Sequence, residues 1–417
     1  MSPAFPLAGI VTGTLVGTSL IASVFSPKSA VLGLILSTLG LWGSLYYQGY
    51  RLQWAPSWWR GGLVLSVCYG ALSSLWSVSP HDSLMLSLRL LGLFAAGSLL
   101  LGGVELFSKR DQEVFRTCLV LSIVLVFILL TIELQTDSKL YSLLASSEPR
   151  ITRYNRILTT LSIIIWPLSR SLWGPHVTRF AAPALLVVTL NILGQFECDA
   201  ALVGFILGLL MLPIALKVRP RLVTWMVCTP LVIGTLAAPL LPLHVISPEK
   251  MQVMAPAIRD FSYHHRLHIW HFTASKIMEK PLTGWGLDAS RQPLFANARG
   301  GWTQPNPDTR PGQPAMMTVQ DQRLLSIHPH NLPLQVWLEL GLPGALLLCV
   351  MFVVLFTRLE QLFQERKDYA FAVSGIVSGL FSTFVSFGAW GGAWLASLWM
   401  AAAIFLALRQ MRGDVNT

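Results

Sequence analysis

Twelve long apolar runs are the feature that most constrains what this chain can fold into. They are centred near residues 16, 38, 68, 93, 125, 163, 186, 207, 231, 345, 379 and 399. A helix needs roughly 20 apolar residues to cross the hydrocarbon core of a bilayer. Only 12% of the residues are charged, about half of the roughly 25% that is usual in soluble proteins. The sequence therefore predicts an all-α polytopic membrane protein with about twelve transmembrane helices.

One long polar stretch divides these runs. We expect residues 1–241 to form transmembrane helices 1–9, residues 242–328 a large outer loop, and residues 329–417 helices 10–12. Inside the loop, residues 259–280 have the periodicity of an amphipathic helix. Residues 281–327 are rich in Pro, Gly, Asn and Gln, which predicts irregular loop. A polar segment of this length is usually a functional lid or disordered, and we expect a lid that forms part of the active site.

The basic residues predict how the helices are oriented. The loops after even-numbered runs, together with the C-terminus, hold Arg51, Arg60, Lys109, Arg110, Arg116, Arg170, Arg179, Lys217, Arg219, Arg221, Arg358, Arg366, Lys367, Arg409 and Arg412. The short loops on the other side hold only Lys28, Lys139, Arg150, Arg153 and Arg156. Cytoplasmic loops are the ones enriched in Lys and Arg. Both termini are therefore expected inside, and the large loop outside.

The net charge and the outward loop limit the ligands. The formal charge is +10, and in a membrane protein this indicates cytoplasmic loop charge and an anionic, phosphate-bearing ligand more than nucleic acid. ATP is not available as an energy source on the outer side. A reaction there must use a substrate that arrives already activated.

A cluster of imidazole, amide and acid side chains lies where the polar loop meets the tenth run. Asn331, Gln335 and Glu339 are spaced four apart, so they form one stripe on a helix that begins near Asn331. His330 would lie at the N-terminal end of that helix, where the dipole favours anions. Glu339 lies inside an apolar run, where ionisable residues usually have a function. The plainer alternative is a polar stripe that packs helices together.

Four arginines lie on the predicted outer side. Arg153 and Arg156 open the sixth run, Arg89 is several residues inside the fourth, and Arg266 is in the lid helix. Arginine stays charged in a low dielectric and binds oxyanions through two parallel hydrogen bonds, which suits a pyrophosphate. Each one alone is equally consistent with a lipid headgroup contact or a local ion pair. The set as a whole favours a pyrophosphate site.

A metal site is a weaker interpretation of the histidines in the lid helix. The helix contains His264, His265, His268 and His271, which include pairs spaced by three and by four residues. An HxxxH spacing alone is a weak zinc signal, and no HExxH motif or cysteine ligand completes it. No metal and no cofactor is predicted.

Three sequence motifs resemble a known family. His330-Asn331, nine residues and Gly341-Leu342-Pro343-Gly344 fit the H-N-x9-G-x-x-G signature of bacterial O-antigen ligases. These enzymes belong to the O-antigen ligase/polymerase superfamily of polytopic membrane glycosyltransferases, which are GT-C-like. Residues 266–270 and 279–286 resemble the stretch that precedes this signature in the superfamily, and residues 154–156 resemble the arginine-bearing start of a middle span.

The resemblance implies a transfer reaction. A glycan would move from undecaprenyl pyrophosphate to a sugar hydroxyl of lipid A–core oligosaccharide, at the periplasmic face of the inner membrane, in lipopolysaccharide biosynthesis. Neither metal nor ATP would be needed. In this interpretation His330 is the general base of one inverting step, and Arg156 and Arg266, helped by Arg89 and Arg153, hold the pyrophosphate.

Several alternatives remain open at the level of sequence. Asn331 and Glu339 would position the base or the helix end, while His328 is a rival base. An O-antigen polymerase or a protein O-oligosaccharyltransferase would use the same donor with another acceptor. A membrane transporter is a remoter possibility, because no internal repeat of the kind usual in transporters is evident.

Overall fold

A computed structural model describes residues 5–54, 57–145, 151–173, 180–196, 198–250, 261–306, 316–325 and 327–409. Over these residues the protein is built almost entirely of helices, as predicted. The twelve apolar runs correspond to α1 (Leu7–Ser23), α2 (Ser29–Tyr47), α3 (Ser57–Leu72), α4 (Pro80–Val104), α5 (Lys109–Gln135), α7 (Asn155–Leu172), α8 (Ala181–Gln195), α9 (Asp199–Lys217), α10 (Pro220–Leu236), α14 (Leu332–Leu362), α15 (Arg366–Val385) and α16 (Gly392–Arg409).

The lengths of these helices differ. Among the described residues, seven helices (α2, α4, α5, α9, α14, α15 and α16) are long and apolar enough to cross a membrane, while α1, α8 and α10 are shorter apolar helices. The chain is therefore an all-α polytopic membrane protein, and the number of twelve spans stays a prediction. α7 belongs to neither group because it carries many polar residues, yet residues 157–170 are all buried inside the bundle.

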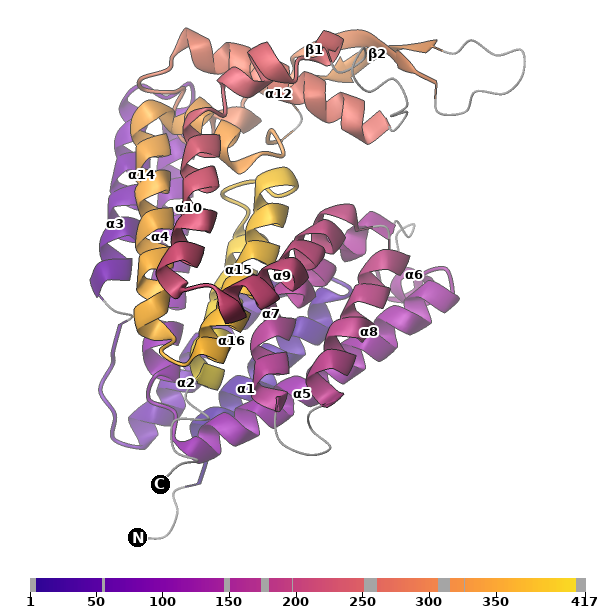
Figure 1. Ribbon diagram of the computed structural model, residues 1–417. Helices are drawn as coiled ribbons and strands as arrows, with labels where there is room; N and C mark the ends of the chain where they lie inside the picture. Colours follow the sequence, from indigo (N-terminus) through magenta and orange to yellow (C-terminus); the bar gives the residue numbers. More distant parts are fainter. Residues whose placement is uncertain are drawn as a thin grey trace.

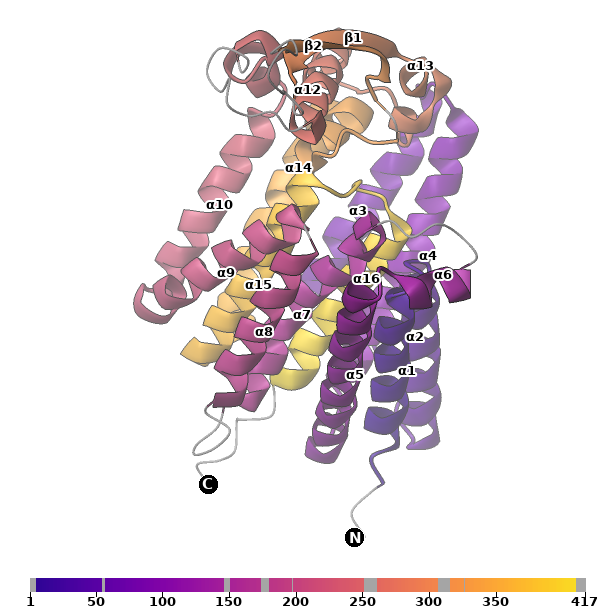
Figure 2. The ribbon, with the colours of Figure 1, turned by 90° about the vertical axis from the view of Figure 1, so that its right-hand side faces the viewer.

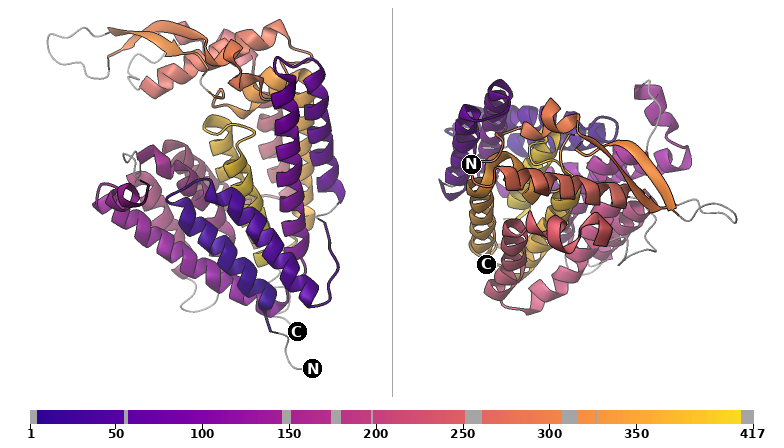
Figure 3. Two further views of the ribbon diagram at one scale, coloured as in Figure 1. Left: turned by 180° about the vertical axis from the view of Figure 1, so that it is seen from behind. Right: turned by 90° about the horizontal axis from the view of Figure 1, so that it is seen from above.

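The helices form two groups beneath a separate layer. α3, α4, α10 and α14 stand together and reach the layer at one end, whereas α1, α2, α5, α7, α8 and α9 form a tilted group beside them (Figure 1). α15 and α16 lie between the groups, where α15 packs against α7 and α9 and α16 packs against α2, α4 and α7 (Figure 2). α1 begins and α16 ends on the side of the molecule opposite the layer (Figures 1 and 3).

The layer is formed by the polar segment between α10 and α14. It contains the π-helical turn η4 (Leu241–Val245), α12 (Phe261–Glu279), the short helices η5 (Ala289–Arg291) and α13 (Pro293–Ala296), and two strands. α12 lies across the ends of the tall helices when the molecule is seen from above (Figure 3). The predicted amphipathic helix over 259–280 is thus present over the residues that the structure describes, which begin again at 261.

The prediction of irregular loop over residues 281–327 is wrong where the short helices η5 and α13 and two strands form. Strands β1 (Arg299–Pro305) and β2 (Met316–Arg323) pair antiparallel, with Trp302 opposite Val319. The strands were not predicted because the Gly, Pro and Gln residues in and around them obscure the alternation of polar and apolar residues. Their pairing is anchored by tertiary contact, because the Trp302 ring stacks on His268 at 4.4 Å and on His265 at 5.5 Å between ring centroids. Propensity alone does not show such a contact.

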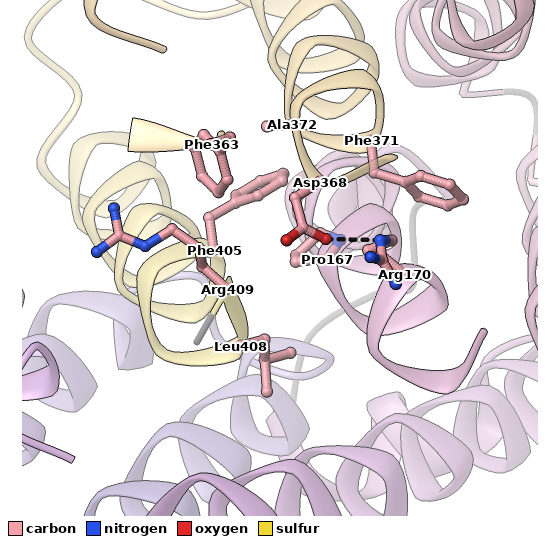
Figure 4. A pocket seen from close by; sticks show the side chains of 9 residues that line it. All are labelled: Pro167, Arg170, Phe363, Asp368, Phe371, Ala372, Phe405, Leu408 and Arg409. Atoms are coloured by element: carbon pink, nitrogen blue, oxygen red, sulfur yellow. Dashed lines mark ion pairs between the residues drawn. The ribbon is translucent and has the colours of Figure 1, made fainter. Parts of the chain in front are cut away.

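A buried charge cluster joins helices at the opposite end. The Arg170 side chain of α7 is only 6% exposed and forms ion pairs with Glu365 at 2.7 Å and with Asp368 of α15 at 2.6 Å. Phe371 and Phe405 stand on either side of this pair (Figure 4). These ion pairs connect α7 to the N-terminal end of α15. The C-terminal end of α15 lies beside the histidine stretch.

Candidate active site

The histidine stretch lies at the N-terminal end of α14, under the layer. Asn331 is the N-cap of α14, and its side-chain oxygen accepts a hydrogen bond from the Leu334 N–H at 3.0 Å. This bond satisfies one of the helix's free N–H groups. His330, directly before the cap, has a φ of +51°. A left-handed backbone is uncommon for a residue other than glycine and gathers at functional sites.

The two imidazoles carry their protons on different nitrogens. His330 Nδ1 lies 2.9 Å from the carbonyl oxygen of Ser386, and a carbonyl can only accept, so Nδ1 holds the proton. The neutral His330 ring therefore has its lone pair on Nε2. His328 Nδ1 lies 3.1 Å from the backbone N–H of His330 and accepts from it, so the proton of His328 is on Nε2.

Both rings are neutral near neutral pH. Burial, and then the charges of His330, Arg291 and Arg156, lower the pKa of His328 to about 3. Burial also lowers the pKa of His330, with help from Arg266 and His265, while the hydrogen bond to Ser386 acts in the opposite direction. Of the two, only His330 presents a free lone pair on Nε2, the atom that a general base needs.

The loop between α15 and α16 fixes both histidines and the stripe below them. The His328 ring packs so closely on Gly388 that a Cβ there would lie 2.9 Å from its Cδ2. Gln335 accepts from the Ala389 N–H at 2.8 Å and donates to Glu339 at 3.1 Å. The stripe therefore packs inward against this loop.

Glu339 is fully buried and joins three elements. Its carboxylate accepts from the Asp288 N–H at 2.8 Å and from the Trp390 indole N–H at 2.6 Å, besides Gln335. A buried carboxylate is tolerated only when such partners satisfy its oxygens. Glu339 thus holds the layer, α14 and the α15–α16 loop together.

The second half of the motif marks an interruption of α14. Gly341 has a φ of +63°, outside the helical region, and the helix bends there. A Cβ on Gly341 would lie 2.5 Å from the Leu282 carbonyl oxygen, so only glycine fits. The freed carbonyls of Leu338 and Glu339 accept from the N–H groups of Trp285 and Gly286, each at 2.9 Å. Residues 279–286 and the G-x-x-G motif, similar to the family in sequence, are in contact.

Two of the four predicted arginines act electrostatically on the histidines. Arg266 acts electrostatically on His330, and Arg156, exposed at the start of α7, acts on His328. The described residues offer neither guanidinium a carboxylate within ion-pair distance. Both are therefore suited to binding an external anion.

The other two predicted arginines interact with residues other than His328 and His330. Arg153 packs over the Tyr141 ring, 4.9 Å from its centroid, and hydrogen-bonds to the Tyr141 hydroxyl. Arg89 is exposed on α4 and acts electrostatically on Asp288. The structure thus places Arg153 in an aromatic contact and Arg89 at the edge of the layer.

Sequence reasoning missed Arg291. This residue ends η5, forms an ion pair with Asp288 at 3.3 Å, and acts electrostatically on His328. The available signal was an arginine in an outward segment, where positive charge is sparse. Its separation of 37 positions from His328 in the sequence concealed this electrostatic effect.

The lid histidines serve the packing of the layer. His265 Nε2 hydrogen-bonds to the Arg323 carbonyl at 2.8 Å, and His271 Nδ1 to the Pro242 carbonyl at 3.2 Å. Within the described part of the chain, no group of three or more His, Cys, Asp and Glu is arranged to hold a metal ion. Trp270 also donates to the Pro329 carbonyl at 2.9 Å, so α12 is bonded directly to the histidine stretch.

An apolar cavity lies directly below the site. It has a volume of about 390 Å³ and runs along α14 from Leu332 to Phe363, with walls from α3, α4, α15 and α16. Ala389 and Trp390, which bond to the Gln335–Glu339 stripe, line its end near the histidines. The walls are almost entirely apolar, so the cavity suits a hydrocarbon chain.

Comparison with known proteins gives the same picture. Residues 184–349, from α8 to the middle of α14, match the family described as O-Antigen ligase. A Rickettsia conorii protein named "Putative polysaccharide ligase" is 24% identical over 368 residues, covering 87% of this chain and 83% of that protein. A Rickettsia typhi protein of the same name is 25% identical over 354 residues, covering 83% and 80%.

The chain is thus a polytopic α-helical membrane protein whose histidine stretch lies under the layer between α10 and α14, with Arg266, Arg156 and Arg291 acting electrostatically on the two histidines. The matched segment contains the layer and the whole H-N-x9-G-x-x-G motif. Over residues 184–349 the chain matches the O-antigen ligase family, and over most of its length it is similar to proteins named as putative polysaccharide ligases.

Proposed function

We propose that this protein is a polysaccharide ligase that transfers O-antigen from undecaprenyl pyrophosphate to a sugar hydroxyl of lipid A–core oligosaccharide. The reaction takes place at the periplasmic face of the inner membrane and needs neither ATP nor metal. Residues 242–328 form the lid, and residues 1–241 and 329–417 form the membrane part. The relatives named as polysaccharide ligases support the reaction class.

The observation that carries the proposal is the free lone pair on His330 Nε2. The Ser386 carbonyl holds the proton on Nδ1, so Nε2 is ready to accept one from a hydroxyl. Burial, with a smaller contribution from Arg266, lowers the pKa of His330 and keeps the imidazole neutral. A base whose protonation state and orientation are fixed in this way accelerates a reaction by roughly 10²–10⁴-fold.

His330 Nε2 takes the proton of the acceptor hydroxyl, and the oxygen attacks the anomeric carbon of the donor from the face opposite the pyrophosphate. The bond between that carbon and the pyrophosphate oxygen breaks, and the leaving group takes the electron pair. The configuration at the carbon inverts. His330 afterwards releases its proton to the departing pyrophosphate or to water.

Arginines stabilise the charge that develops on the leaving group. Arg156 and Arg266 contact the pyrophosphate, and Arg89 and Arg153 widen the positive field around it. The guanidinium groups of Arg156 and Arg266, which form no ion pair with a described carboxylate, and the N-terminal end of α14 favour a bound anion. The apolar cavity below the histidines holds the polyprenyl chain, so the phosphates lie at the level of His330.

The test is a reconstituted reaction. Purified protein in lipid nanodiscs is mixed with undecaprenyl-pyrophosphate O-antigen and lipid A–core, without ATP and with EDTA present. Glycosylated lipid A–core is the expected product. Elongated lipid-linked glycan would instead indicate a polymerase, and a glycosylated protein an oligosaccharyltransferase. The absence of any transfer would contradict the proposal and favour transport.

A further inference from the structure

Residues 288–292 are held rigidly beside the histidine stretch. The Asp288 N–H donates to Glu339 at 2.8 Å, and the Ser290 hydroxyl donates to the Ile327 carbonyl at 3.1 Å. The Gln292 amide donates to Asp82 at 2.9 Å. Three hydrogen bonds to three different elements fix this short segment, and Ser290 is bonded to the residue that precedes His328.

Arg291 is the cationic side chain that this segment presents. Its side chain is 47% exposed, and its Nε lies 3.3 Å from Asp288 Oδ1, an atom that has no hydrogen-bond partner among the described residues. A single loose ion pair leaves most of the five guanidinium donors unused. Rigid backbone with unused donors is the arrangement expected of an anion-binding residue.

His328 supplies a matching donor. Its Nδ1 accepts from the His330 backbone, so its Nε2 carries a hydrogen and cannot accept a proton while the ring is neutral. A pKa of about 3 keeps the ring neutral over the physiological range. Arg291 and Arg156 both act on this ring. The Nε2–H of neutral His328 is therefore a hydrogen-bond donor and not a proton acceptor.

We propose that Arg291 and the Nε2–H of His328 form, together with Arg156, the subsite that binds the pyrophosphate of the donor. This inference rests on the function proposed above and gives the two histidines different roles. His330 removes a proton, and His328 donates a hydrogen bond to the leaving group. Asp288 is the counter-ion that holds Arg291 when the site is empty.

The experiment measures the binding of inorganic pyrophosphate to the full-length protein in nanodiscs by titration calorimetry, so that no turnover is needed. R291A and H328A are expected to weaken binding roughly tenfold, in line with the loss of a charge-assisted hydrogen bond. R291K and H328Q, which keep a charge and a donor, should bind within about threefold of wild type. D288N removes the counter-ion and should tighten binding. R299A is the matched control, because Arg299 is an equally exposed arginine of the layer, paired with Asp321.

The outcomes separate this inference from the proposed function. Equal pyrophosphate affinity in wild type, R291A and H328A would overturn the subsite. In the transfer assay, R291A should raise the KM for the lipid-linked donor more than it lowers kcat, and the KM for the acceptor should stay unchanged. A tenfold loss of activity in H328Q as well as H328A would also overturn the assignment, because Gln retains the donor. Failure of the wild type to transfer glycan would instead contradict the proposed function.

Discussion

His328 and His330 are two positions apart, and their different hydrogen-bond partners place the ring proton on different nitrogens. His330 is oriented by a carbonyl from the α15–α16 loop, whereas His328 is oriented by the backbone N–H of His330. The H-N-x9-G-x-x-G motif allowed His330 to be predicted as the base from the sequence. The sequence left His328 as a rival because the deciding partner, Ser386, is 56 residues away and acts through its backbone.

The first prediction concerns the base itself. H330A should lower kcat by roughly 10²–10⁴-fold, the usual contribution of a general base, with little change in the KM for the donor. H328Q should retain most of the activity. The measurement is initial transfer rates at equal amounts of folded protein. H81A is the control, because His81 is an outward histidine of α4 with an 81% exposed side chain. Wild-type turnover by H330A would remove it from the mechanism.

The second prediction concerns pH. The base works when neutral, so the rate is full above its pKa and falls as pH drops through it. Because burial and Arg266 lower the pKa of His330, the acid limb of kcat/KM should lie below the value of about 6.5 for an ordinary histidine. R266A removes a positive charge and should move that limb to higher pH. An unmoved limb in R266A would show that another group titrates.

At the level of elements, α14 is two helices in series. Its first part, Leu332–Leu340, carries the stripe, and Gly341 bends the chain where the layer bonds to it. The sequence predicted a helix that begins near Asn331. It did not predict a break, because an apolar run that continues through a glycine gives no sign of a positive φ. Tertiary hydrogen bonds from residues 285 and 286 decide it.

The third prediction tests this break. G341A should destabilise the protein by about 1–3 kcal/mol, the usual cost of a non-glycine residue in a strained conformation, and should lower activity by displacing Glu339. G92A in α4 is the matched control, because nothing lies within 4 Å of a Cβ built there. Thermal unfolding in detergent and the transfer rate are measured together. Equal stability of the two variants would mean that the bend is not required.

At the level of the whole molecule, hydropathy predicted the architecture well. The helices lie where the apolar runs lie, and α1 begins and α16 ends on the side opposite the layer. The β1–β2 pair was not predicted, because it is held by the stacking of Trp302 on the histidines of α12, which is a tertiary contact. The burial of α7 was also beyond the sequence, since composition does not distinguish a polar helix at the centre of a bundle from one at its surface.

The fourth prediction tests what holds that centre. R170M should destabilise the bundle by up to about 3–5 kcal/mol, because it removes the buried guanidinium that forms ion pairs with Glu365 and Asp368. A charge-swapped pair, R170D with D368R, should recover part of the loss. Unfolding is followed by circular dichroism in nanodiscs, with R299A as the exposed control. If R170M unfolds like wild type, the cluster does not contribute to stability.

The Ser386 carbonyl has a consequence for genetics. It lies beyond residue 349, where the family match ends, and every amino acid supplies the same oxygen. We therefore expect a scan of substitutions at position 386 to be silent, whereas deletion of one residue between 386 and 391 abolishes transfer. The orientation of His330 thus depends on the length of the α15–α16 loop and not on the side chain at position 386. A comparison of side-chain identities does not detect such a dependence.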